Sequence, residues 1–492
     1  MSDGAGGAAG VGTGLRYGQA SARWVLLATV LGSAMAMLDG TVVNLALPRI
    51  ADDLDASFTG LQWILNGYTL TLAGLILLGG ALGDRFGRRR VFMLGAAGFT
   101  LASLGCAIAP SVGTLVAARV VQGVAAAMLT PGSLAILQAS FDPRDRGRAI
   151  GAWSGLGGVA TAIGPFLGGW LVDAASWRWI FLINVPVGVA VVTVASRHVP
   201  ESRDPEATGR VDWLGAVLGA LGLAGLTLGL SEQRWPAAVV GAVVLVAFVV
   251  TEWRTRHPLV PLAIFRSRTF SGTNVVTLLL YGALGVVFFL LGLVLQGPLG
   301  YTPLQAGAAT MPVTLAMLGL SARAGALAQR IGPRLPMTVG PLLVATSMIM
   351  LTGITADSTY VTGILPGIVV FGLGLSLTVA PLTATALGAV DVHHAGVASG
   401  VNNAVARTGQ VLAVAAIPVV AGFSPGVAVA GTELLDGFDQ VMRFAAAAVV
   451  GAAVIAWVTV RRPLEAPEPV SSTAWHCAAG GPPAAAPTSR AA

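Results

Sequence analysis

The stretch Leu38-Asp-Gly-Thr-Val-Val-Asn-Leu-Ala-Leu-Pro48 lies near the end of an apolar run that begins at Trp24. This run is long enough to cross a lipid bilayer, which takes about 20 residues of α-helix. It contains one acidic residue, Asp39. An aspartate at the centre of a spanning helix costs about 2.5–3.5 kcal/mol, so such residues usually face a polar cavity or a partner. Asp39 is therefore a candidate functional residue; the plainer interpretation is a solvated charge in the outer headgroup zone.

The composition places the chain among polytopic membrane proteins. Apolar residues make up 55% of it, charged residues make up 10%, and the mean hydropathy is +0.80, values that exclude a soluble globular protein. All 28 basic residues are arginine, and they sort by loop, so the net charge of +6 reports topology rather than nucleic-acid binding. Cys106 and Cys477 lie in environments too different to pair, and we predict no metal site and no cofactor.

Fourteen apolar runs predict fourteen transmembrane helices in an all-α protein. Six runs come first, two follow a polar link, and six more complete the chain: 24–45, 61–82, 91–109, 112–137, 150–172, 180–195, 213–230, 236–253, 270–296, 304–327, 337–354, 361–387, 401–421 and 442–460. The predicted organisation is a disordered cytoplasmic tail, a six-helix bundle, a cytoplasmic link with two inserted helices, a second six-helix bundle and a second disordered cytoplasmic tail. These five parts cover residues 1–22, 23–196, 197–269, 270–461 and 462–492.

The arginines support this topology. They concentrate in the loops after the second, fourth, sixth, eighth and tenth spans, whereas the other loops hold Arg49, Arg178, Arg234 and Arg443. By the positive-inside rule, we expect both termini to be cytoplasmic. The predicted location is the inner (cytoplasmic) membrane. The residues before Met37 could also pass for a signal peptide, but apolar spans continue through the whole chain, so we expect a retained first helix.

A repeated loop indicates two related halves. Gly80-Ala-Leu-Gly-Asp-Arg-Phe-Gly-Arg-Arg89 aligns with Gly325-Ala-Leu-Ala-Gln-Arg-Ile-Gly-Pro-Arg334. Each copy follows the second helix of its six-helix block, as expected for two halves related by an axis along the membrane normal.

At these residues the chain resembles the major facilitator superfamily, specifically its fourteen-span drug:proton antiporters, from residue 24 to about residue 461. The resemblance implies a major facilitator fold and a gating role for the first loop as a cytoplasmic latch. The residues that would carry this role are Gly80, Asp84, Arg85, Gly87, Arg88 and Arg89. The alternative is that the arginines of this loop only determine topology.

A second unusual charge lies in the fourth span. Arg119, within Ala-Ala-Arg-Val-Val-Gln-Gly, is permanently charged and must face protein or water and seek an acidic or carbonyl partner. Asp39 is a candidate partner; other acids and backbone carbonyls are alternatives. The resemblance implies proton coupling through Asp39 and Arg119, whereas a purely structural tether is the competing interpretation for Arg119.

The fifth span carries a small-residue pattern that resembles the signature of the superfamily's exporters. Its core residues are Gly164, Pro165, Gly168 and Gly169. Glycines allow close helix packing and Pro165 can bend the helix, so ordinary packing is the alternative to an antiporter role. Trp177 to Gly188 also resembles this subgroup, as do Asn402, Asn403 and Arg407. For Arg407, snorkelling to the interface and a functional role both stay open.

The substrate prediction rests on an absence of acids. Some relatives that export dications carry an extra acidic residue in the ninth or tenth span, but residues 270–296 and 304–327 contain no Asp or Glu. We therefore expect a neutral or singly charged amphipathic compound. Nine polar or aromatic residues are candidates for the substrate cavity, with helix packing as the alternative for each: Asn44, Gln62, Trp63, Asn66, Tyr68, Gln122, Asn274, Tyr281 and Gln296.

The favoured function is a proton-coupled antiporter that exports drugs, dyes or antibiotics by alternating access. A proton-coupled transporter of one metabolite, such as an amino acid, a sugar or a siderophore, is the alternative. Common phosphate-binding, zinc and serine-hydrolase motifs do not occur in the sequence, so we do not expect an enzyme. The expected partners are the substrate, protons and the lipid bilayer, without nucleic acid, and the resemblance implies a monomer. His393 and His394 could sense pH, although solvated loop residues are the simpler interpretation.

Overall fold

The computed structural model describes residues 14–204, 211–255, 258–391 and 395–460, in which the named elements are helices. Those before the inserted pair are α1 Ala20–Leu54, α2 Phe58–Phe86, α3 Arg88–Ala107, α4 Val112–Ser140, α5 Pro143–Ala174, α6 Trp179–Leu182 and α7 Asn184–His198. The pair itself is α8 Trp213–Ser231 and α9 Trp235–Arg254. The remaining elements are η1 Leu262–Arg266, α10 Arg268–Gln296, α11 Pro303–Ala309, α12 Met311–Ile331, α13 Arg334–Met350, η2 Tyr360–Ile364, α14 Leu365–Gly388, α15 Ala395–Ala415, α16 Ile417–Ala421 and α17 Gly431–Thr459.

The number of apolar segments agrees with the sequence prediction. Within the described ranges, 13 helical stretches are long and apolar enough to cross a membrane, and the shorter apolar helix Arg334–Met350 is the fourteenth. The all-α class and the fourteen segments are therefore confirmed. The division of the chain into two bundles at residues 196 and 270 stays a prediction.

Several predicted spans are interrupted by prolines. The breaks at Ile183, Thr310 and Ala416 each come two or three residues before a proline. Proline removes a backbone donor and clashes with the preceding turn, which ends or kinks a helix at these places.

Several boundaries of the predicted segments need correction. The last helix begins at Gly431 rather than near residue 442, so Arg443 lies inside α17 and pairs with Asp439 at 3.2 Å; it is not a loop residue. Arg49 likewise lies inside α1. Residues 14–19, which we expected in the N-terminal tail, have a defined arrangement, since the Leu15 N–H donates to the Ser140 carbonyl at 2.8 Å. The rest of both tails, like His393 and His394, lies outside the described residues.

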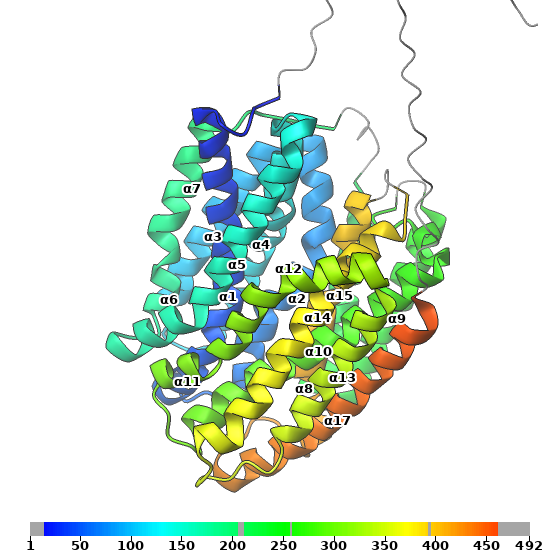
Figure 1. The fold of residues 1–492 in the computed structure, drawn as a ribbon. Coiled ribbons are helices and arrows are strands. Elements are labelled where there is room, and N and C mark those ends of the chain that lie inside the picture. Colours follow the sequence, from blue (N-terminus) through cyan, green and yellow to red (C-terminus); the bar gives the residue numbers. More distant parts are fainter. Residues whose placement is uncertain (1–13, 205–210, 256–257, 392–394, 461–492) are drawn as a thin grey trace, which may run out of the picture.

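Contacts between loops define two sides of the first seven helices. On the side where the described chain begins, Leu15 contacts Ser140 at the end of α4. On the same side, the Arg88 N–H donates to the Ser202 carbonyl at 2.9 Å. On the opposite side, Arg178 pairs with Asp53 at 2.6 Å. We call these the N-terminal side and the far side; the first is at the top of Figure 1.

The two halves of the molecule meet on the far side. In Figure 1, helices α1–α7 lie mainly at the upper left and most helices from α10 onward lie at the lower right, with α11 at the lower left below α6. One apolar cluster joins them on the far side and includes Phe58 from the first half with Phe289 and Phe371 from the second. The Gln296 amide also donates to the Leu45 carbonyl at 3.0 Å. On the N-terminal side the halves have separate clusters, connected where Leu77 of α2 packs against the second.

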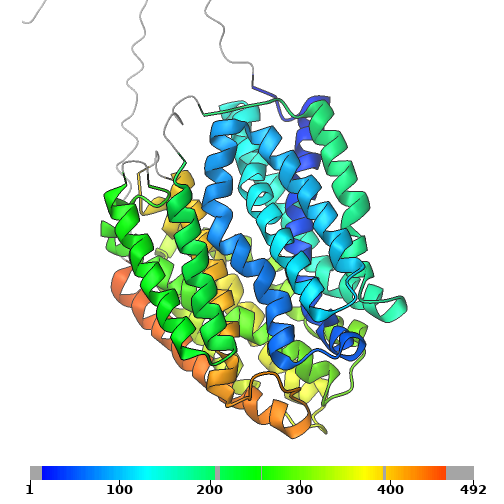
Figure 2. The same ribbon diagram turned by 180° about the vertical axis from the view of Figure 1, so that it is seen from behind.

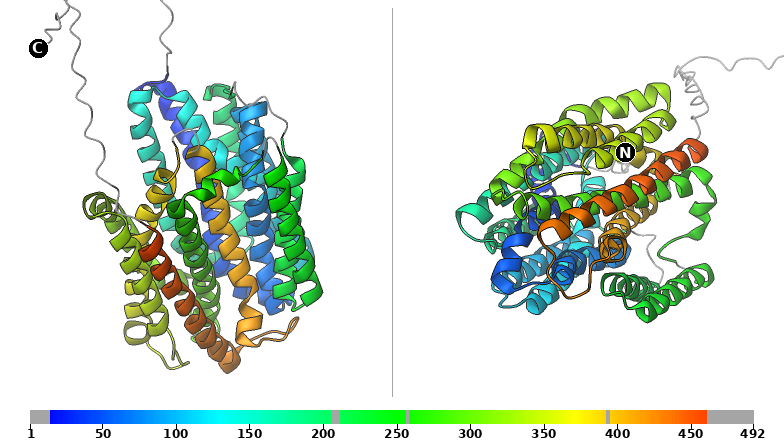
Figure 3. Two further views of the ribbon diagram at one scale, coloured as in Figure 1. Left: turned by 90° about the vertical axis from the view of Figure 1, so that its right-hand side faces the viewer. Right: turned by 90° about the horizontal axis from the view of Figure 1, so that it is seen from below.

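The inserted helices form a hairpin at the edge of the molecule. Figures 2 and 3 show α8 and α9 in green, side by side and outside the other helices. Helix α8 packs on α2 and α15, whereas α9 packs mainly on α8. Accordingly, α9 exposes a row of valines that suits contact with lipid: Val239, Val240, Val243, Val246, Val249 and Val250.

Candidate functional site

The structure brings Asp39 of α1 and Arg119 of α4 together in the interior of the first half. An Asp39 Oδ2 to Arg119 Nη1 ion pair joins them, and their side chains are 1% and 0% exposed. The Asp39 Oδ1 accepts a hydrogen bond from the Gln122 amide at 2.9 Å. The Arg119 Nε donates to the Ile64 carbonyl at 3.0 Å, which also ties α4 to α2.

Further side chains complete this buried network. The Gln122 amide donates to Ser103 Oγ at 2.9 Å, and its carbonyl accepts from Arg119 Nη1 at 2.6 Å. The Cys106 thiol lies 3.6 Å from the same carbonyl oxygen. Neither Ser103 nor Cys106 was predicted as a site residue from the sequence. Their i, i+3 spacing places them on one face of α3, and this spacing was the available signal.

Aromatic rings enclose the guanidinium. The Arg119 Cζ lies 4.4 Å from the centre of the Tyr68 ring and 5.7 Å from that of Phe181. The Tyr68 hydroxyl donates to the Ala36 carbonyl at 3.2 Å and so fixes the ring against α1. Such a cation gains from the ring faces while it is kept from water.

The stability of this buried network depends on the charge of Asp39. A buried ion pair is stable while both charges and their hydrogen bonds are in place, but removing one charge leaves the other uncompensated at a cost of about 3–5 kcal/mol. Apart from Asp39, the guanidinium has only neutral partners, the Ile64 carbonyl, Gln122 and the two rings, and its Nη2 has no hydrogen-bond partner among the described residues. Protonation of Asp39 would therefore force Arg119 to find a new environment.

The residues predicted for a substrate cavity fall into two groups. Five are buried in helix contacts, namely Gln62, Asn66, Tyr68, Gln122 and Asn274, and four are partly exposed, namely Asn44, Trp63, Tyr281 and Gln296. The Trp63 indole donates to Glu232 at 3.3 Å, so it faces the inserted hairpin. Whether any of the nine contacts a substrate stays a prediction.

The predicted gating loop is tied to the chain that follows α7. Asp84 pairs with Arg88 at 2.9 Å, and the Arg89 N–H donates to Glu201 at 3.1 Å. Gly87 has φ +113°, and a Cβ there would come within 2.7 Å of a Glu201 carboxylate oxygen. The backbone conformation therefore favours glycine, and a methyl group there would also require the Glu201 carboxylate to shift. Glu201 was not singled out from the sequence.

The predicted antiporter motif brings α5 close to two neighbours. A Cβ at Gly164 would lie 2.8 Å from Thr41 Oγ1 of α1, and one at Gly168 would collide with Val42. A Cβ at Gly169 would lie 2.5 Å from the Pro303 carbonyl oxygen of the second half. The motif therefore packs beside the helix that carries Asp39 and also at the far-side contact between the halves.

In the second half, an amide contact joins α10 and α15, and Arg407 lies further along α15. The Asn402 amide of α15 donates to Asn274 at 3.2 Å and to Thr277 at 2.9 Å, both on α10. Arg407, one turn further along α15, donates to Gln410 at 3.1 Å. Asn403 is exposed and donates to the Ser399 carbonyl.

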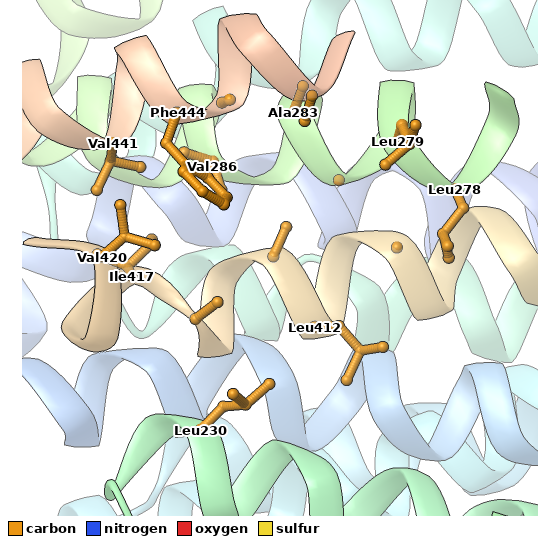
Figure 4. A pocket seen from close by; sticks show the side chains of 16 residues that line it. Leu230, Leu278, Leu279, Ala283, Val286, Leu412, Ile417, Val420, Val441 and Phe444 are labelled. Atoms are coloured by element: carbon orange, nitrogen blue, oxygen red, sulfur yellow. The ribbon is translucent and has the colours of Figure 1, made fainter. Parts of the chain in front are cut away.

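Two cavities lie near these elements. The larger, of about 330 Å³, lies between α8, α10, α15 and α17 and is lined by apolar residues such as Leu278, Leu412 and Phe444 (Figure 4). None of the nine predicted cavity residues lines it. The smaller, of about 10 Å³, lies between α1, α5 and the α6–α7 segment and is lined in part by Asp39 and Asn184.

Comparison with known proteins gives a consistent result. The sequence profile of the Major Facilitator Superfamily matches residues 29–414. The puromycin resistance protein of Streptomyces alboniger is 36% identical over 91% of this chain and 93% of its own length. The tetracenomycin C resistance and export protein of Streptomyces glaucescens is 36% identical, covering 80% of this chain and 75% of that relative.

Solved structures agree on the fold. A peptide transporter of the POT family, in an auto-inhibited form, superposes with a TM-score of 0.68 at 17% identity, covering 90% of this chain and 99% of that one. A D-xylose–proton symporter superposes with a TM-score of 0.64 at 15% identity, covering 89% and 98%.

Proposed function

The chain belongs to the Major Facilitator Superfamily, and from this premise we propose that it exports drugs, dyes or antibiotics in exchange for protons. It is a multi-pass membrane transporter and not an enzyme. Two relatives that are 36% identical to it over the aligned residues are named for resistance to puromycin and for resistance to and export of tetracenomycin C. These names support a small antibiotic-like substrate.

The observation that carries the coupling is the buried ion pair of Asp39 and Arg119. With Asp39 ionised, the pair is neutral as a whole and holds α1 against α4. With Asp39 protonated, the positive charge of Arg119 stays in a low-dielectric interior and favours a different helix arrangement. The two protonation states of Asp39 thus bias two arrangements of the molecule, which is what an antiporter requires.

The arginines support an orientation for these arrangements. The loops on the N-terminal side carry Arg85, Arg88 to Arg90 and Arg144 to Arg148, so we assign this side to the cytoplasm. With that assignment, the apolar cluster that joins the halves lies on the outer side of the membrane, and the halves have separate apolar clusters on the cytoplasmic side. We further propose that the protein lies in the cytoplasmic membrane with both ends inside and works as a monomer.

The substrate is expected in the space between the halves. Helices α10, α11 and α12 carry no acidic side chain, which favours a neutral or singly charged amphipathic compound. Of the nine predicted cavity residues, Asn44 and Tyr281 are partly exposed on α1 and α10, helices from opposite halves that contact each other. They are the first positions to vary when substrate preference is tested.

The test is proton-driven transport of a fluorescent monocation in inverted membrane vesicles. Asp39→Asn removes the charge with little change of shape, so gradient-driven transport should fall at least about a hundredfold, the range for losing an essential proton-transfer group. Asp55→Asn is the matched control: Asp55 ends the same helix, is exposed and has φ +49°, which asparagine tolerates. Transport that survives Asp39→Asn would move the coupling elsewhere and contradict the proposal.

A further inference from the structure

Asp39 and Asn44 lie on different faces of α1. The partly exposed residues of this part of α1 are Met37, Leu38, Gly40, Thr41 and Asn44. Of these, Asn44 lies against the second half, since a Cβ at Gly292 would lie 3.2 Å from its carbonyl oxygen, whereas Thr41 lies against Gly164 of α5. At about 100° per residue, Asp39 is turned well away from Asn44 around the helix. A compound beside Asn44 and a proton on Asp39 would therefore lie on different faces of the same helix.

The small cavity lies on Asp39's own face of α1. Its lining comes from three segments: Leu38, Asp39 and Val42 of α1, Leu167, Gly168 and Leu171 of α5, and Ile180, Ile183 and Asn184 of the α6–α7 segment. Among these side chains, those of Asp39 and Asn184 alone are polar. We call this space the crevice.

Asn184 is the reason to expect a ligand in the crevice. The residue is 3% exposed, and its Nδ2 has no hydrogen-bond partner among the described residues. A buried amide donor without a partner is costly, and such groups are usually satisfied by ordered water. The crevice volume of about 10 Å³ is close to the space of one water molecule.

The residues that line the crevice lie between Asp39 and the far-side ends of α5 and α6. Leu171 is three residues from the end of α5, and Ile180 is two residues after the far-side residue Arg178. The α5 and α6–α7 residues that line it carry no charge. The charged and titratable groups around Asp39 come instead from other helices: Arg119 of α4, Tyr68 of α2 and Cys106 of α3, with Arg407 of α15 acting on Tyr68 through its charge.

We propose that the crevice binds a water molecule, positioned by Asn184, that passes protons between the far side and Asp39. The water oxygen accepts the Asn184 Nδ2–H, and a water hydrogen points to the carboxylate. A hydronium ion arriving there gives one proton to an Asp39 oxygen and is left as neutral water. Asn184 is a positioning residue and does not itself ionise. The inference rests on the proposed function and adds to it that proton and drug take separate routes.

The experiment compares two transport modes of the reconstituted protein with a fluorescent monocation. Asn184→Leu should slow proton-driven transport about tenfold, the effect of losing one hydrogen bond that orients the water. Exchange of the monocation without a pH gradient should stay within about twofold, because it needs no proton delivery. Lowering the pH on the far side by about one unit should restore the proton-driven rate, since tenfold more hydronium offsets tenfold slower delivery.

A second variant tests the crevice without touching Asn184. Leu167→Phe adds bulk to the crevice and should give the same selective loss. Ile163→Phe is its control, because Ile163 lies one turn earlier on α5, is 50% exposed and adds its bulk outside the crevice. Equal losses in both transport modes, or a loss that low pH does not restore, would overturn the proposal and leave Asn184 a packing residue.

The outcome also separates this inference from the proposed function. If the wild type shows no proton-driven transport, the proposed antiport fails, and the water route fails with it. If the wild type is active, Asp39→Asn is inactive and both crevice variants match the wild type, antiport stands and the water route alone is wrong.

Discussion

The two halves of the molecule contain the same repeated loop but treat charge differently. The first half buries the pair of Asp39 and Arg119 completely, whereas the second half has the Asn402–Asn274 amide contact between α15 and α10, with Arg407 partly buried further along α15. Amide hydrogen bonds do not change with pH, whereas a carboxylate can bind a proton. We therefore expect the proposed coupling to depend on the first half.

The repeated loops show the same contrast at the membrane surface. In the first copy Asp84 pairs with Arg88, and Glu201 binds the backbone of Arg89. The second copy has Gln329 in place of that aspartate, and its Arg334 lies 3.9 Å from the centre of the Trp457 ring. The second loop is therefore attached through a cation–π contact rather than through carboxylates.

The largest expected effect tests the charge of the first half. Arg119→Met leaves Asp39 buried without its counterion and should lower the free energy of unfolding by about 3–5 kcal/mol. The double variant Asp39→Asn, Arg119→Met should recover most of that loss, because no uncompensated charge remains. Thermal unfolding in detergent measures both. A double variant that loses the sum of the two single effects would show that the two residues act independently.

A smaller effect is expected from the amide contact of the second half. Asn402→Leu removes two hydrogen bonds and leaves Asn274 less well satisfied, which should cost about 1–3 kcal/mol. The pH dependence of transport should stay as in the wild type. A shifted pH profile would instead assign part of the coupling to the second half and break the comparison.

The smallest expected effect is the difference between substitutions of the two loop glycines. Gly87 and Gly332 have φ of +113° and +86°, so alanine at either position should cost about 1–3 kcal/mol. Gly87→Ala should exceed Gly332→Ala by about 1 kcal/mol, because the new methyl group also meets Glu201. Unfolding of the two variants side by side measures the difference. Equal losses would mean that Glu201 moves away freely and does not fix the first loop.

The sequence predicts the charged part of the site well because charges stand out in apolar helices. Asp39 and Arg119 could be found, and suggested as partners, by that contrast alone. Gln122, a candidate cavity residue, binds Asp39 and Ser103, and these contacts depend on how α3 and α4 pack; whether it also contacts a substrate stays a prediction. Asn184 is one ordinary amide in the sequence; its significance arises because α1, α5 and α7 leave space beside it. The sequence of a single helix carries no periodic pattern that reveals such packing between helices.

The fold, like the site, can be predicted from the sequence only in part. Apolar length predicts the fourteen segments, because the bilayer sets the length of a spanning helix. Prolines explain the breaks at Ile183, Thr310 and Ala416 once they are seen, but a proline also occurs inside unbroken α4, at Pro131. Sequence alone does not show which prolines end a helix, since neighbouring helices can satisfy the freed carbonyls.

The separation of Asp39 and Arg119 along the chain has a consequence for biosynthesis. The two residues are 80 positions apart, so the ribosome makes the acidic helix well before its basic partner. At roughly 5–20 residues per second, the first helix waits about 4–16 s for the fourth. During that interval a lone carboxylate must stay near the membrane surface or at the insertion machinery, where water or protonation can satisfy it. Final placement of the first helix therefore depends on the arrival of the fourth, and the first half matures as one unit.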